Sequence, residues 1–168
     1  MKTKVVLKTL LDIMLFIAGA VLLEAILKFL VVYISGFPNY FVDKETLANN
    51  PFKVKSLIVL NVFNQALFFS CILFLRSIAK IYRDEKSFYQ LKILSYLKIS
   101  GWCLLFFSGL EIVIRTLEIL ITPNTFQLAG ITSTQKSALL AVLAILMIRL
   151  SKIFKKTVEA NQENEFTI

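Results

Sequence analysis

Four long apolar stretches constrain what this chain can fold into. They run over residues 5–34, 56–78, 97–121 and 137–154. Crossing about 30 Å of hydrocarbon takes about 20 helical residues, so these stretches have the length of membrane spans. Hydrophobic residues make up 57% of the 168-residue chain, and a soluble domain of that size could not bury so much apolar surface. The sequence therefore predicts an integral membrane protein.

The helix-breaking residues fall between the apolar stretches. Pro38 and Pro51 bracket the first connection, and Pro123 and Gly130 lie in the third. Because short connections make sequential helices antiparallel neighbours, we expect an all-α, up-and-down bundle of four transmembrane helices. Residues 1–168 then form a single membrane domain that ends in a short cytoplasmic tail at 155–168, which is acidic from residue 157 onward.

The basic residues are distributed unevenly about the spans. Of the 19 Lys and Arg residues, 13 lie beside the span ends at the N-terminus, around the second connection or at the C-terminal end, and four lie on the other side. This bias places both termini in the cytoplasm. The net charge of +8 is thus explained by topology and by anionic lipid headgroups, and no direct contact with nucleic acid is predicted.

The sequence lacks the residues that most enzyme sites require. It contains no histidine, which excludes a Ser-His-Asp triad, a His-based zinc site and a His-ligated haem. It also has no phosphate-binding loop and no Gly-rich dinucleotide turn. Cys71 and Cys103 lie within spans, where a thiol behaves as a small apolar group. We therefore predict no catalytic residue, no metal, no cofactor and no enzymatic activity.

Three small residues lie in the third span. Gly101, Ser108 and Gly109 are of the kind that lets helices approach closely in a membrane. The sequence therefore predicts close helix packing at these positions.

Charged residues inside the first and third spans form same-face series. Glu24 and Lys28 are four residues apart, and Glu111, Arg115 and Glu118 continue at steps of four and three. Both spans run from inside to outside, so all five charges are expected in the outer half of the bilayer. Polar residues of the second span are expected nearby and could hydrogen-bond to the charges: Asn61, Asn64 and Gln65.

Two interpretations of these charges remain open. Intramembrane charges normally face a protein interior or a water-filled cavity, so the cluster could bind an ion, a proton or a small cation. Alternatively, the i, i+4 pairs could form a satisfied salt-bridge network that fixes helix register. Asp12 lies near the cytoplasmic end of the first span, and we expect it at the interface beside Lys8.

The connections carry aromatic and amphipathic patterns. The cluster at residues 37–41 is typical of an interfacial anchor, with a ligand contact as the alternative. Residues 80–98 repeat apolar side chains between lysines, which predicts an amphipathic helix along the headgroups or a docking face for a cytoplasmic partner.

The C-terminal residues 154–168 resemble the closing signature of a bacterial four-span membrane family of unknown function, approximately F-x-x-G-x-x-L-x-x-E-x-x-L-T-I. Thr157 and Ala160 depart from the usual Gly and Leu. Phe88, Leu97 and the Gly101–Trp102 pair resemble the family's pattern before and within the third span. The tail positions that match in type and spacing, with a conservative Phe for Leu, are Phe154, Glu163, Phe166, Thr167 and Ile168.

The resemblance implies a bacterial cytoplasmic (inner) membrane protein with both termini inside. Genes of this family often lie beside a gene for a helix-turn-helix regulator, which implies a cytoplasmic regulator as a partner of the loop and tail. The family supplies no established catalytic residues to carry over.

Three functions follow as hypotheses. The first is a non-enzymatic tether or sensor in the membrane for a cytoplasmic regulator. The second is a small transporter or ion-coupled exporter that uses Glu24, Glu111 and Glu118, and that is oligomeric, for example a homodimer, because four spans are few for a transport path. The third is an immunity-type protein that shields a membrane target.

Overall fold

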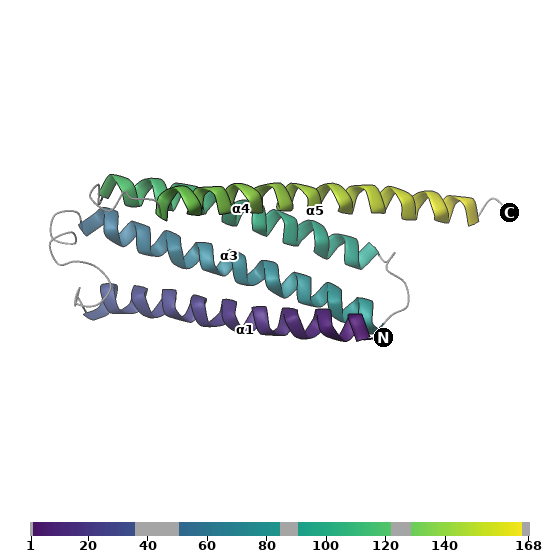
Figure 1. Cartoon of the computed structure of the whole chain (residues 1–168), viewed down its shortest axis with the longest axis horizontal. Coiled ribbons are helices and arrows are strands. Elements are labelled where there is room, and N and C mark those ends of the chain that lie inside the picture. Colours follow the sequence, from purple (N-terminus) through teal and green to yellow (C-terminus); the bar gives the residue numbers. More distant parts are fainter. Residues whose placement is uncertain (1, 36–50, 85–90, 122–128, 166–168) are drawn as a thin grey trace.

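The chain folds into long helices that lie side by side (Figure 1). The computed structural model describes residues 2–35, 51–84, 91–121 and 129–165. Within these ranges the helices are α1 (Lys2–Leu30) with a π-helical extension η1 (Val31–Ser35), α3 (Pro51–Asp84), α4 (Leu91–Ile121) and α5 (Ala129–Glu165). The predicted all-α bundle of four long helices is confirmed.

Each of the four helices contains a segment long and apolar enough to cross a membrane. The segments are Val5–Tyr33, Pro51–Tyr82, Lys92–Ile119 and Gln135–Ala160, with mean hydropathies between 1.7 and 2.4. Such segments make the chain a multi-pass membrane protein. Pro51 is the first residue of α3, where a missing N–H is tolerated, and Gly130 lies in the first turn of α5 rather than between helices.

The prediction of an amphipathic helix along the headgroups over residues 80–98 is wrong for the described residues of that range. Ile81 and Tyr82 complete α3, while Leu91, Leu94 and Leu97 belong to the first turns of α4. Leu94 is buried, so at least this apolar position packs against a neighbouring helix instead of lying along the headgroups. Residues 85–90 and the aromatic cluster at 37–41 lie outside the described residues.

Each helix packs mainly against its neighbours in sequence, α1 on α3, α3 on α4 and α4 on α5. Both termini lie at the same end of the bundle, called here the termini end (Figure 1). The sequence left open whether the first and third spans touch. Among the described residues, α1 and α4 both pack against α3, and they are not one of the main packing pairs themselves.

The helices α4 and α5 approach each other closely at Gly101. A Cβ atom on Gly101 would lie 2.7 Å from Cγ1 of Ile148 and 3.1 Å from the backbone oxygen of Ala144. The Ser151 hydroxyl donates a hydrogen bond of 2.7 Å to the Leu94 carbonyl between the same two helices. The predicted packing role of Gly101 is therefore confirmed, whereas that of Gly109 is wrong, since a Cβ there would meet nothing within 4 Å.

Buried residues of α5 recur every seven positions, at Ser137, Ala144, Ser151 and Val158, with Ile148 also buried between them. Three of these five side chains are Ser or Ala, which lets α5 lie close along α4.

Small residues also line the centre of the bundle. Cys71 of α3, Leu104 of α4 and Ala144 of α5 form the buried core cluster. The Cys71 sulfur lies 3.2 Å from the Ser100 hydroxyl, which ties α3 to α4. As predicted, both cysteines pack as small apolar groups in the membrane interior, Cys71 within the core and Cys103 against it. On α1, the residues at the same seven-residue spacing are Leu11, Ala18, Ala25 and Val32.

Candidate functional site: a charged cavity between α1, α3 and α4

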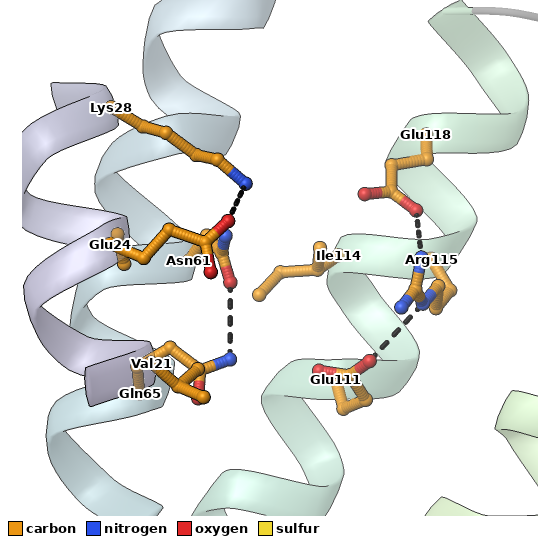
Figure 2. Close-up of a pocket in the computed structure, with 10 residues that line it drawn as sticks. Val21, Glu24, Lys28, Asn61, Gln65, Glu111, Ile114, Arg115 and Glu118 are labelled. Atoms are coloured by element: carbon orange, nitrogen blue, oxygen red, sulfur yellow. Dashed lines mark hydrogen bonds and ion pairs between the residues drawn. The ribbon is translucent and has the colours of Figure 1, made fainter. Parts of the chain in front are cut away.

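A polar cavity lies between three helices, in the part of the bundle away from the termini end. Its volume is about 220 Å³, enough for several water molecules. Figure 2 shows its two charged walls, α1 on one side and α4 on the other, with α3 behind α1. The lining residues are Val21, Glu24, Ala25 and Lys28 of α1, Asn61 and Gln65 of α3, and Glu111, Ile114, Arg115 and Glu118 of α4.

The α4 wall is a chain of three charges on one helical stripe. The Arg115 Nε donates to Glu111 Oε1 at 3.1 Å, and another guanidinium nitrogen donates to Glu118 Oε2 at 2.7 Å. Spacings of four and three residues place both carboxylates next to the guanidinium without distortion of the helix. One arginine thus neutralises part of the charge of two acids.

The α1 wall carries a single ion pair. The Lys28 ammonium lies 2.6 Å from Glu24 Oε1, with the acid N-terminal to the base as helices favour. The Glu24 side chain is nevertheless 59% exposed, so most of this carboxylate is not covered by the chain itself.

The α3 helix connects to the α4 wall through one buried amide. The Asn64 Nδ2 donates to Glu111 Oε2 at 2.8 Å, and Asn64 is fully buried. Its Oδ1 atom is buried without a hydrogen-bond partner. Nearer the cavity, the Gln65 amide donates to Asn61 Oδ1 at 3.4 Å. An unpaired buried carbonyl oxygen is costly, so Asn64 holds Glu111 in place at some expense of stability.

The lining has an excess of negative charge at considerable depth. Among the residues that line the cavity, three carboxylates face two cationic side chains, an excess of one negative charge within the described lining. Glu24 lies nine residues inside the end of its span at Tyr33, and Glu111 lies eight residues inside the end of its span at Ile119. At 1.5 Å per residue both carboxylates are about 12–14 Å below the span ends. Charges at such depth are expensive in lipid.

The structure brings all of the predicted charges and polar neighbours to one end of the bundle. Asn61 and Gln65 line the cavity, and Asn64 contacts Glu111 from behind it. The ion pairs and hydrogen bonds described above join the charges into two groups, one on α1 and one on α4, that face each other across the cavity (Figure 2). From the sequence, the five charges were expected to form a single network if the first and third spans touched. Residue spacing within one helix could not reveal the cavity between two helices.

A cross-helix ion pair near the termini end was not predicted from the sequence. Asp12 lies 3.9 Å from Lys8, as expected, but it also pairs with Arg76 of α3. The signal was available, because Arg76 lies near the end of an apolar span that runs antiparallel to the first. This pair fixes α1 against α3 at the end opposite the cavity.

The residues that resemble the bacterial family are scattered. Gly101 and Trp102 lie inside the α4 span, with Gly101 buried against α5 and Trp102 stacked on Phe106 at 5.9 Å. Phe154 is half-buried on α5. The remaining positions lie outside the described side chains: Phe88, Glu163, Phe166, Thr167 and Ile168.

No family model, curated protein or solved structure matches this chain. Within the described residues, no group of three or more Cys, Asp or Glu side chains is arranged to hold a metal ion. The candidate site is therefore defined by its own geometry: mixed charges, two amides and a cavity.

Proposed function

We propose that this protein binds a small monovalent cation in the charged cavity and carries it across the membrane, as a non-enzymatic, ion-coupled transporter of the bacterial inner membrane. The observation that carries the proposal is the excess of carboxylates over cationic side chains among the described residues that line a 220 Å³ cavity at bilayer depth. A bound cation would balance the charge of this lining. With both termini in the cytoplasm, as the Lys and Arg distribution predicts, the cavity faces the outer side.

The mixture of groups in the cavity supports a cation rather than an anion. Carboxylate and amide oxygens can replace the water shell of a small cation, whereas an anion would meet three carboxylates. Glu111 is the central group, because it is held by both Asn64 and Arg115 and its side chain is only 18% exposed. The proposed role involves no covalent chemistry.

Uptake into vesicles tests the proposal. The purified protein is reconstituted into phosphatidylethanolamine–phosphatidylglycerol vesicles, and uptake of radiolabelled sodium and radiolabelled tetramethylammonium is measured. We expect uptake of at least one probe above that of protein-free vesicles. Glu111→Gln should lower this uptake at least tenfold, because the excess negative charge is removed.

The matched control is Glu159→Gln, the same exchange in an exposed α5 ion pair with Lys155 at 3.5 Å, far from the cavity. This variant should retain uptake within twofold. Uptake equal to that of protein-free vesicles for both probes would contradict the proposal, as would equal losses in the two variants.

As a second function, we propose that the termini end of the molecule tethers a cytoplasmic regulator to the membrane. The 37-residue α5 is about 55 Å long, and its C-terminal part extends beyond the start of α1 and of α4 (Figure 1). That extension would carry the family-like tail away from the bundle, where a soluble partner could reach it. The tail side chains that would make the contact lie outside those described.

A further inference from the structure

The contact between Glu111 and Asn64 contains one hydrogen-bond acceptor more than the ionised carboxylate can use. Both oxygens of Glu111 accept hydrogen bonds, Oε1 from Arg115 at 3.1 Å and Oε2 from the Asn64 amide at 2.8 Å. Asn64 is fully buried, and its Oδ1 has no hydrogen-bond partner in the part of the chain that the structure describes. A buried amide oxygen without a partner is costly, so its position beside Glu111 calls for an explanation.

The spare oxygen can serve a protonated Glu111. A half-turn about the Cβ–Cγ bond exchanges the oxygen and the nitrogen of an amide, and this terminal torsion has a broad, roughly two-fold profile. Oδ1 of Asn64 would then take the place of Nδ2, 2.8 Å from Glu111 Oε2. That separation is typical of an O–H···O hydrogen bond as well as of an N–H···O one. A proton on Oε2 would therefore be donated to Asn64.

Protonation of Glu111 then removes no hydrogen bond from the site. The ionised carboxylate accepts from Asn64 and from Arg115. In the protonated form, Oε2–H donates to Asn64 while Oε1 still accepts from Arg115. The amide leaves one polar atom without a partner in each form, Oδ1 in the first and one N–H in the second. Hydrogen bonding at this contact therefore does not oppose the uptake of a proton.

A proton and a monovalent cation would change the charge of the cavity by the same amount. Each adds one positive charge to a described lining in which carboxylates exceed cationic side chains by one. Because net charge at this depth is expensive, one added charge is favourable and a second is not. Occupancy by a cation would therefore disfavour the proton, and by linkage the proton would disfavour the cation to the same extent.

The groups that face Glu111 come from three helices. On α5, which packs against α4, the described charge nearest in depth is Lys136, and it is exposed and does not line the cavity. The charged side chains in the lining are Arg115 and Glu118 of α4 and Glu24 and Lys28 of α1, while α3 contributes the amides of Asn61, Asn64 and Gln65.

We propose that Glu111 is a proton-binding site in which Asn64 accommodates both protonation states, and that the proton on Glu111 exchanges with the cation in the cavity. This inference deepens the proposed function and rests on it for the identity of the cation as cargo. The O–H bond forms at Oε2 with a proton taken from water and breaks when the cation enters, which returns the proton to water. Cation and proton would thus be carried in opposite directions.

Infrared spectroscopy of the reconstituted protein tests the proton site. The full chain is titrated between about pH 5 and pH 9 in vesicles without sodium or tetramethylammonium. We expect a carboxylic acid C=O band that is absent from Glu111→Gln and retained in Glu159→Gln. Asn64→Leu should move this band to higher wavenumber, because Oε2–H then lacks its acceptor.

The control for Asn64→Leu is Ser70→Ala. Ser70 lies on the same helix and donates to the Ala66 carbonyl at 2.8 Å, so its loss should leave the band in place. Circular dichroism shows whether each variant folds, and the comparison of wild type with Glu111→Gln decides the question even if Asn64→Leu unfolds.

Proton release on cation binding tests the exchange. Sodium or tetramethylammonium is added to the protein in weakly buffered medium that contains a pH indicator. At least one of the two should remove the acid band and release about one proton per chain from the wild type and none from Glu111→Gln. While Glu111 is mostly protonated, the apparent dissociation constant of that cation should rise about tenfold for each unit by which the pH falls.

The absence of an acid band that depends on Glu111 would overturn the inference, even if cation uptake were observed. Cation uptake without proton release would overturn it as well. An acid band at Glu111 in a protein that takes up neither cation would refute the transport function and the exchange, and would leave the proton site standing.

Discussion

Gly101→Ala is expected to lower the free energy of unfolding by about 1–3 kcal/mol, the usual cost of overpacking a close contact. The new methyl group would lie 2.7 Å from Ile148 Cγ1 and 3.1 Å from the Ala144 carbonyl oxygen, so α4 and α5 would have to move apart. Thermal unfolding of the purified protein in one detergent, followed by circular dichroism, measures the effect.

Gly109→Ala provides a control on the same helix. A Cβ there meets nothing within 4 Å, and alanine favours the helix over glycine by up to about 1 kcal/mol, so stability should be unchanged or raised. Adding Ile148→Ala to Gly101→Ala should recover part of the loss. If the two glycine variants melted at the same temperature, the close approach of α4 and α5 at Gly101 would be contradicted.

Arg115→Met is expected to be the most destabilising change in the charged cavity. It removes two charge-assisted hydrogen bonds, to Glu111 and Glu118, and leaves the two carboxylates of the α4 wall without their common cation. Hydrogen bonds to charged groups contribute about 1.5–3 kcal/mol each. Because the Arg115 side chain is partly exposed, we expect the loss of each of its two bonds to cost an amount near the lower end of that range.

The same melting experiment on Lys156→Met serves as the comparison. Lys156 is exposed on α5 near the termini end of its span, and its replacement should change stability by less than about 0.5 kcal/mol. If the Arg115→Met protein melted at the same temperature as the wild type, the ion pairs of the α4 wall would not stabilise the bundle.

The number, length and order of the helices could be predicted because each depends on local sequence. A stretch of about 20 apolar residues has few alternatives to a membrane span, and short connections leave neighbouring spans antiparallel. The ends of helices were less predictable. The residues at 80–84 and 91–98 have an amphipathic pattern, yet they extend α3 and α4, since pattern alone does not say whether an apolar face meets lipid headgroups or another helix.

The candidate site was predictable in its members but not in its geometry. Spacings of three and four residues pointed to the pairs on α1 and α4, because those pairs form within one helix. The contact between Asn64 and Glu111 joins residues 47 positions apart and depends on how α3 packs against α4. Likewise, Gly101 and Gly109 look equivalent in sequence, and only the position of α5 distinguishes them.

The most direct test of the central claim, that the excess charge of the cavity serves binding rather than stability, is the melting temperature of Glu111→Gln against wild type between about pH 5 and pH 9. A glutamine oxygen can still accept a hydrogen bond from Asn64, and Arg115 loses its bond to residue 111 but keeps its 2.7 Å contact with Glu118. Because the exchange also balances the charges of the described lining, which offsets the lost bond, we predict that stability is retained or increased. A large loss of stability at every pH would contradict this account and identify the charges as a structural network.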